Sequence, residues 1–293
     1  MSLRHISLSD GERLAVWESG PEDAPACLFL HGFPENHRAW RHQIAHLESA
    51  YRCIAPDLRG YGASSKPADV AAYATPRLAG DVLELANALG LERFTLLGHD
   101  WGGLLAWEVA TAAPDRLEAL VVANAPHPAL FQHVLNTDPA QLAASAYIDL
   151  LRDPAIDPVL AEHGLGPVLQ RAFGDGALRA MEREELGALL KQWRDPAAAL
   201  AMVNWYRASG ITLPDAAAPA APPPAPQPIA TPTLVLWGEA DTALLPANLD
   251  GLAQWVPHHT ITRLPDIGHF SPWQAPEAVN QAISAFMGKN RLS

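Results

Sequence analysis

Residues 94–105 read FTLLGHDWGGLL, and this stretch decides the fold. An apolar run, Phe94–Leu97, leads into a tight turn between small residues, and a helical pattern follows from Leu104 to Ala113. A strand, a sharp turn and a helix in this order are typical of a nucleophile elbow, which pushes one side chain out at the top of a sheet. We predict that Asp100 is that side chain.

An aspartate at the elbow predicts different chemistry from the serine that commonly stands there. A serine hydroxyl must lose its proton to a neighbouring base, whereas an aspartate, with an ordinary pKa of about 3.9, is already anionic at neutral pH. A carboxylate can displace a leaving group from saturated carbon, and the resulting ester then needs a histidine to activate water. The simpler alternative is that Asp100 only caps the following helix, because aspartate is a favoured N-cap residue.

Composition and charge narrow the class of protein. The chain of 293 residues suits one α/β domain with an insertion, and it has no long apolar run of the kind that spans a membrane. The net charge of −12 and the absence of a basic stripe predict that neither nucleic acid nor a membrane is a partner. The N-terminus lacks the apolar segment of a signal peptide, so we expect a cytoplasmic protein. We further expect a monomer or homodimer that uses no cofactor and no metal.

Strand-like and helix-like stretches alternate through most of the chain. This alternation predicts an α/β fold with a mostly parallel, eight-stranded sheet and helices on both faces. The recognisable strands are Leu14–Glu18, Cys27–Leu30, Cys53–Ala55, Phe94–Leu97, Leu117–Ala123, Thr233–Trp237 and Thr260–Leu264. The expected core helices are His37–Leu47, Thr75–Leu89, Gly103–Ala113, Asn248–Trp255 and Pro276–Met287.

The alternation is interrupted between Pro126 and Pro228. Helical patterns occur there without a convincing strand, at Pro139–Arg152, Leu178–Arg194 and Pro196–Ser209. We therefore expect a core made of residues 1–125 and 229–293, with a helical lid at 126–228 inserted after strand 6, above the sheet edge where ligands bind. The return segment 214–228 contains seven prolines and six alanines, which offer almost nothing for chemistry.

Two backbone N–H groups are candidates for an oxyanion hole. In an elbow enzyme, one donor comes from the turn after an early strand and the other from the residue after the nucleophile. The turn here is HGFP at residues 31–34, so the donors would be the amides of Phe33 and Trp101. They would stabilise the tetrahedral intermediate of ester hydrolysis.

The histidine and the second acid are chosen by their position in the chain. His269 follows the last predicted strand, and Asp241 follows the strand before it, which gives the order nucleophile, acid, histidine. Glu239 is the rival acid, and the end of the earlier strand offers only the amide of Asn124. We expect His258 and His259 to lie in a solvated turn, and His99 to be a buried structural hydrogen bonder.

With these residues in place, the chain resembles the α/β-hydrolase superfamily and, within it, the soluble epoxide hydrolases. The resemblance spans nearly the whole chain and is weakest in the lid. The motifs that carry it are HGFPE at 31–35, DLRGYG at 57–62, GHDWGG at 98–103 and WGEADTAL at 237–244. It implies that Asp100 attacks the substrate and that His269, oriented by Asp241, activates the hydrolytic water.

The same resemblance implies two lid tyrosines that protonate the opened epoxide. Residues 204–207, NWYR, match the second tyrosine motif well, and Tyr147, seven residues before Pro154, matches the first more loosely. These residues would be Tyr206 and Tyr147, although both also lie on apolar helix faces where a tyrosine can simply be packed. From the same motifs we expect His31, Pro34 and Trp205 to line the pocket of a small hydrophobic organic substrate.

A halide is the competing leaving group, and the residues near the nucleophile help to decide between an epoxide and a halide substrate. Haloalkane dehalogenases also carry tryptophan after the nucleophile, but they usually show Asn where this chain has Phe33. Fluoroacetate dehalogenases prefer Arg at the position of Trp101 and an acid at the position of Asn124. These departures favour epoxide hydrolysis over dehalogenation. A third hypothesis, a non-catalytic ligand-binding member of the fold, is the weakest, because Asp100, Asp241 and His269 are all present.

Overall fold

The computed structural model describes residues 2–173, 183–214, 225 and 227–290. Its centre is an eight-stranded sheet of order β1-β2-β4-β3-β5-β6-β7-β8. The pairs β1–β2 and β2–β4 are antiparallel, and the remaining pairs are parallel. The strands are β1 (Ser2–Ser7), β2 (Arg13–Ser19), β3 (Ala26–Leu30), β4 (Arg52–Pro56), β5 (Phe94–His99), β6 (Leu117–Ala123), β7 (Thr233–Gly238) and β8 (His259–Leu264).

This sheet confirms the predicted α/β architecture and adds one strand to those read from the sequence. Strand β1 escapes a pattern search because all but one of its residues are exposed. Its pairing with β2 is therefore decided by backbone hydrogen bonds and not by an apolar face. His259, expected in a turn, is instead the first residue of β8.

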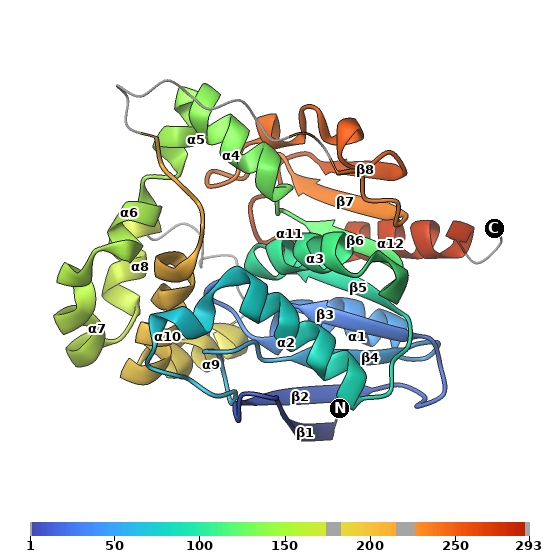
Figure 1. The fold of residues 1–293 in the computed structure, drawn as a ribbon, viewed down its shortest axis with the longest axis horizontal. Coiled ribbons are helices and arrows are strands. Elements are labelled where there is room, and N and C mark those ends of the chain that lie inside the picture. Colours follow the sequence, from blue (N-terminus) through green and yellow to red (C-terminus); the bar gives the residue numbers. More distant parts are fainter. Residues whose placement is uncertain (1, 174–182, 215–224, 226, 291–293) are drawn as a thin grey trace.

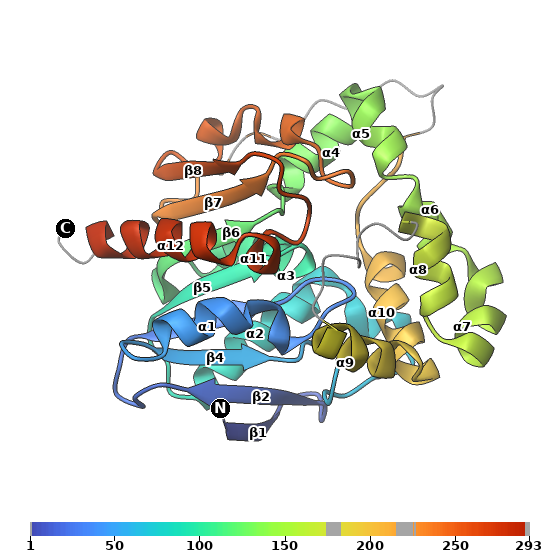
Figure 2. The same ribbon diagram turned by 180° about the vertical axis from the view of Figure 1, so that it is seen from behind.

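Helices cover both faces of the sheet, and each face has its own apolar cluster. Helices α2 (Thr75–Ala88) and α3 (Trp101–Ala112) lie on one face, and α1 (Arg41–Leu47) and α12 (Pro276–Asn290) lie on the other (Figures 1 and 2). Side chains alternate along a strand, so Leu28 of β3 joins the first cluster and its neighbour Phe29 joins the second. The buried strands are consequently apolar on both sides.

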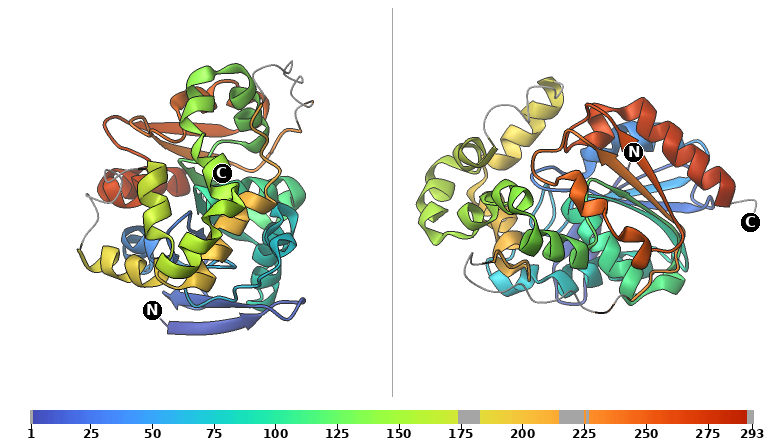
Figure 3. Two further views of the ribbon diagram at one scale, coloured as in Figure 1. Left: turned by 90° about the vertical axis from the view of Figure 1, so that its left-hand side faces the viewer. Right: turned by 90° about the horizontal axis from the view of Figure 1, so that it is seen from above.

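Between β6 and β7 the chain forms a group of helices that we call the inserted helices. They lie beyond the carboxyl ends of the parallel strands (Figures 1 and 3). They are α4 (Pro128–Thr137), α5 (Pro139–Ala144), α6 (Tyr147–Arg152), α7 (Asp157–His163), α8 (Gly166–Phe173), α9 (Arg183–Trp193) and α10 (Pro196–Ala208). Two of them, α5 and α10, start at a proline preceded by an aspartate cap; in α10, for example, Asp195 accepts a hydrogen bond from the N–H of Ala197.

Two predicted helices are broken in the structure. The segment Pro139–Arg152 divides into α5 and α6 at Ser145, whose buried hydroxyl accepts a hydrogen bond from Gln141. The segment Asn248–Trp255 is not one helix, because Gly251 has a left-handed backbone (φ 81°) between two short 3₁₀ turns. Residues 178–182 of the helix predicted at Leu178–Arg194 lie outside the described residues, as do most of 214–228.

The remaining short elements connect the layers. Helix α11 (Ser271–Gln274) follows His269 and leads into α12. The 3₁₀ turns are η1 (His37–Trp40), η2 (Val70–Tyr73), η3 (Pro114–Arg116), η4 (Pro154–Ile156), η5 (Pro246–Leu249) and η6 (Leu252–Gln254).

Candidate active site

Asp100 occupies the sharp turn between β5 and α3. Its backbone has φ 51° and ψ −120°, a conformation that non-glycine residues rarely adopt. The turn can be this tight because small residues surround it: a Cβ on Gly102 would come within 2.3 Å of the carbonyl oxygen of Leu30. Strained backbone of this kind is typical of functional sites, and here it directs the carboxylate into a cavity.

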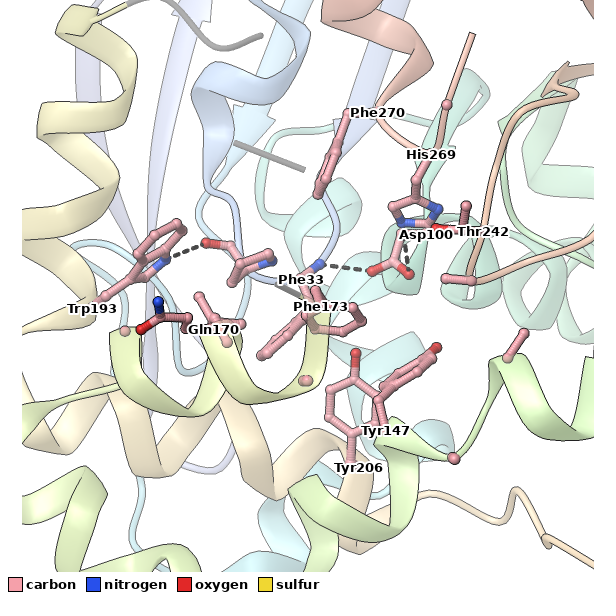
Figure 4. A pocket seen from close by; sticks show the side chains of 18 of the residues that line it. Phe33, Asp100, Tyr147, Gln170, Phe173, Trp193, Tyr206, Thr242, His269 and Phe270 are labelled. Atoms are coloured by element: carbon pink, nitrogen blue, oxygen red, sulfur yellow. Dashed lines mark hydrogen bonds and ion pairs between the residues drawn. The ribbon is translucent and has the colours of Figure 1, made fainter. Parts of the chain in front are cut away.

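The carboxylate of Asp100 is held by the turn after β3 and faces an imidazole. The N–H of Phe33 donates a hydrogen bond of 2.7 Å to its Oδ1. The Nε2 atom of His269 lies 3.5 Å from its Oδ2 (Figure 4). Gly32 allows this approach, because a Cβ there would meet the Cβ of Asp100 at 2.5 Å.

Asp241 orients His269 from the other side of the ring. The Nδ1 atom of His269 lies 2.8 Å from Oδ2 of Asp241, and because a carboxylate only accepts, we assign the ring proton to Nδ1. The other oxygen of Asp241 accepts hydrogen bonds from the N–H groups of Ala243 (2.8 Å) and Leu244 (3.0 Å). Both oxygens of the buried carboxylate are therefore fixed.

Asn124, at the end of β6, completes the support of this carboxylate. Its amide donates a 2.9 Å hydrogen bond to Oδ2 of Asp241 and accepts one of 3.1 Å from the N–H of Gly238. Its backbone is left-handed (φ 42°), a region in which asparagine is enriched. In the sequence, Asn124 is only an amide at a place where an acidic residue was sought. In the structure it is a residue that positions Asp241.

The two carboxylates and the imidazole perturb one another. Burial would raise the pKa of Asp100 and of Asp241, but the charge and hydrogen bonds of His269 outweigh it and lower both pKa values. Burial would lower the pKa of His269, and the two carboxylates together raise that pKa well above its ordinary value. The electrostatics of the free site therefore favour the imidazolium form of His269 between the two carboxylates.

His99 contacts the backbone at His269 and does not line the cavity. It is fully buried, its Nε2 lies 2.9 Å from the backbone oxygen of His269, and its Nδ1 lies 2.9 Å from Glu35. Trp273 donates a further hydrogen bond of 2.8 Å to Glu35. The expectation that His99 is a structural hydrogen bonder is confirmed.

Tyr147 and Tyr206 come from two inserted helices and meet across the cavity from His269. Their ring centroids are 6.0 Å apart, and their hydroxyls are turned toward Asp100 (Figure 4). Burial, together with the charge of Asp100, raises the pKa of both phenols, so both stay protonated at neutral pH. The ring of Trp101 packs edge-on against the phenol of Tyr206, with 5.0 Å between the ring centroids.

These groups surround a cavity of about 960 Å³. Phe33, Pro34, Asp100, Tyr147, Tyr206 and His269, all predicted site residues, are among those that line it. The sequence analysis missed its apolar wall, which includes Leu186, Leu190 and Trp193 of α9 and Phe173 of α8 (Figure 4). The helical spacing of the three α9 residues is the signal that could have identified this wall.

Two predicted pocket residues are not part of the cavity lining. His31 is fully buried, and its Nε2 accepts a hydrogen bond from the N–H of Leu58 (3.0 Å). Trp205 is buried behind Tyr206 and donates to the backbone oxygen of Arg59 (2.9 Å). The structure contradicts both pocket predictions. Trp205 precedes Tyr206 by one position, so the two side chains leave the helix in directions about 100° apart. At the turn after β3, Phe33 and Pro34 line the cavity, whereas the ring of His31 is turned to the backbone of Leu58.

The described residues contain no group of three or more His, Cys, Asp or Glu side chains arranged to hold a metal ion. Among these same residues, no helix is long and apolar enough to cross a membrane.

Comparisons with known proteins show the family to which the chain belongs. A sequence model described as the alpha/beta hydrolase fold matches residues 25–276. Epoxide hydrolase 3 of Xenopus tropicalis is 33% identical over 98% of this chain and 78% of its own. The chain belongs to the epoxide hydrolase branch of the α/β-hydrolase family. A further relative, the AB hydrolase superfamily protein YfhM of Bacillus subtilis, is 31% identical over 95% of this chain and 96% of its own.

Solved structures from the same branch have the same fold. A structure described among novel epoxide hydrolases from metagenomes of hot environments superposes with a TM-score of 0.94, at 49% identity over 98% of each chain. The epoxide hydrolase of Bacillus megaterium, solved with an inhibitor, superposes with a TM-score of 0.87, at 28% identity over 97% of this chain and 100% of that one.

Proposed function

We propose that this protein hydrolyses epoxides of small hydrophobic organic molecules to vicinal diols through an ester of Asp100. The observation that carries the proposal is the arrangement around that carboxylate. An imidazole lies on one side of it and two protonated phenols lie on the other, all at one cavity. Epoxide hydrolases that are similar along 98% of this chain support the same reaction.

In the first half-reaction, Asp100 attacks a ring carbon of the epoxide. Its lowered pKa keeps it anionic, so no base is needed. As the carbon–oxygen bond of the ring breaks, the electron pair goes to the oxygen, and Tyr147 or Tyr206 donates a proton to it. Both phenols are neutral and aimed at the site, as a general acid must be.

Ester formation itself prepares the second half-reaction. Once Asp100 is esterified, its negative charge is gone, and one of the two carboxylates that raise the pKa of His269 no longer does so. The imidazolium can then return its proton to the tyrosinate through solvent in the cavity. Neutral His269 is the base that ester hydrolysis requires, and Asp241 stabilises the imidazolium that forms again.

In that second step His269 removes a proton from water, and the oxygen of that water attacks the ester carbonyl. The N–H groups of Phe33 and Trp101 would stabilise the negative oxygen of the tetrahedral intermediate. Phe33 already donates to Asp100 in the free site. Collapse of the intermediate breaks the bond between the carbonyl carbon and the substrate oxygen. That oxygen takes up the second proton of the water to complete the diol, and the carboxylate of Asp100 is restored.

We also propose that residues 126–228 act as a lid on a core formed by 1–125 and 229–293. The support is that the inserted helices supply both tyrosines and much of the apolar wall, whereas the sheet edge supplies the charged groups. The cytoplasmic location and the state of monomer or homodimer stay predictions.

Dehalogenation is the alternative use of the same nucleophile, and the two phenols that face Asp100 argue against it. A halide leaves as a stable anion and needs no proton donor, whereas the oxygen of an opened epoxide does. A non-catalytic role is also disfavoured, because Asp100, His269 and Asp241 are in contact.

The test is a panel of aryl and alkyl epoxides alongside chlorinated and brominated alkanes. We expect diol from the epoxides and no halide release. The matched control, Asp100→Asn, should form diol at least about 10⁴-fold more slowly, with intact mass confirming that the amide has not reverted to aspartate. Halide release without diol formation, or full activity of the verified amide variant, would overturn the proposal.

A further inference from the structure

A second, smaller cavity shares lining residues with the main one, the nucleophile Asp100 among them. Its volume is about 40 Å³, against about 960 Å³ for the main cavity. We call it the side pocket, and its own walls include Leu104, Phe131, Ile148, Ile211 and Leu244. These side chains come from α3, from the inserted helices, and from the segments after α10 and β7.

Three residues line both cavities: Asp100, Tyr147 and Tyr206. In the proposed reaction these residues hold the epoxide ring, because the ring oxygen must face the phenols and a ring carbon must face the carboxylate. A ring held by these three residues would have one carbon facing each space. The substituent of one carbon would then extend into the main cavity, and that of the other into the side pocket.

The two spaces differ in size by more than an order of magnitude. One water-sized group needs roughly 10–15 Å³ of such volume, so the side pocket has room for about three small atoms or groups. The main cavity has room for an aryl group or a long alkyl chain, beside the apolar side chains of Phe173, Leu186 and Trp193.

The side pocket is also apolar beyond the three shared residues. Apart from Trp101, its remaining walls are aliphatic, proline or phenylalanine side chains: Leu104, Ala125, Pro126, Pro128, Phe131, Ile148, Ile211 and Leu244. A hydroxyl or carboxylate placed there would lose its hydration without gaining a partner from these walls. Hydrogen and short alkyl groups fit both its size and its chemistry.

Building on the proposed function, we propose that the substrates are unsymmetrical epoxides. One ring carbon carries a bulky apolar group, held in the main cavity, and the other carries hydrogen or a short alkyl group, held in the side pocket. The side pocket is then the element that limits which 1,2-disubstituted epoxides are accepted.

The test is a series of trans-1-phenyl-2-alkyl epoxides in which the alkyl group is methyl, propyl or butyl, with styrene oxide as the terminal reference. For the unmodified protein we expect kcat/KM to be at least about tenfold lower for the butyl than for the methyl compound, because a filled pocket excludes added methylenes. A flat series would overturn the inference while leaving the proposed function intact. Absence of diol from every epoxide, styrene oxide included, would overturn both.

Variants of the side pocket make the test specific. Ile211→Ala should reduce the methyl-to-butyl ratio to about threefold or less, and Ile211→Phe should lower kcat/KM for the methyl compound relative to styrene oxide. Leu104→Ala, on α3, should enlarge the side pocket independently of Ile211 and lower the same ratio. Leu190→Ala, a truncation in the wall of the main cavity, should change the ratio less than about twofold. An unchanged ratio in both enlarged variants, with normal melting temperatures, would contradict the assignment.

Discussion

The two halves of the site are built in different ways. The sheet edge supplies Asp100, Asp241 and His269. Both carboxylates accept hydrogen bonds from main-chain N–H groups, and the imidazole is held by Asp241. The inserted helices supply Tyr147 and Tyr206, which are positioned by ring packing. The comparison teaches that the charged groups are held by directional hydrogen bonds, whereas the neutral proton donors are held by packing against aromatic and apolar side chains.

Replacing the two tyrosines should give the largest difference between the rates of the two half-reactions. We expect the double variant Tyr147→Phe/Tyr206→Phe to slow ester formation about 10²–10⁴-fold, because the departing oxygen loses its proton donors. Hydrolysis of the ester, which depends on the sheet edge, should change far less. Rapid-quench measurement of both half-reactions checks this.

The control for the tyrosines is Tyr73→Phe. Tyr73 is buried, but its hydroxyl donates to the backbone oxygen of Pro67 and not to the cavity. This variant should lose stability without a selective loss of ester formation. Equal slowing of the two half-reactions in the tyrosine pair variant would contradict the division of roles.

The pH dependence of ester hydrolysis is the next largest effect. The two carboxylates raise the pKa of His269 in the free site, and the ester removes the charge of Asp100. Hydrolysis should therefore rise about tenfold per pH unit at low pH and level off above the pKa of His269 in the ester. That pKa should be lower than the value for the free protein, which NMR of the imidazole reports. A hydrolysis rate that falls with rising pH would refute this assignment.

Asn124 should have an intermediate effect confined to the sheet edge. Asn124→Gly removes the hydrogen bond to Asp241 while keeping a residue that tolerates positive φ. Losing a hydrogen bond to a charged group should slow ester hydrolysis about tenfold, with ester formation little affected. A loss of thermal stability with both half-reactions unchanged would reduce Asn124 to a structural role.

The smallest expected effect concerns the contact between the two halves. Glu185 of α9 pairs with Arg38 (Nε–Oε2 2.8 Å) and lies 3.6 Å from Arg41, both of the core. Glu185→Gln should lower the free energy of unfolding by about 1 kcal/mol or less, because Arg38 is partly solvated. Glu184→Gln is the matched control, since Glu184 is almost fully exposed. Equal losses in both variants, measured by denaturant unfolding, would exclude a specific contact.

The sequence predicts the sheet edge far better than the inserted helices, and the reason is physical. A left-handed turn at Asp100 between closely packed glycines restricts the residues on either side, so it leaves a readable motif. Packing restricts only size and polarity, so α4, α7 and α8 were not anticipated and Trp205 was placed on the wrong side of its helix. The support from Asn124 depends on β6 and β7 being neighbours, which no local pattern reveals.

The central claim is that a carboxylate oxygen of residue 100 bonds to substrate carbon, and intact-mass analysis of His269→Gln tests it most directly. Without its base, the protein should accumulate one equivalent of adduct with the full mass of the added epoxide, and peptide mapping should place that mass on Asp100. Rapid diol formation by this variant with no added mass on the protein, or an adduct on any other residue, would contradict the account.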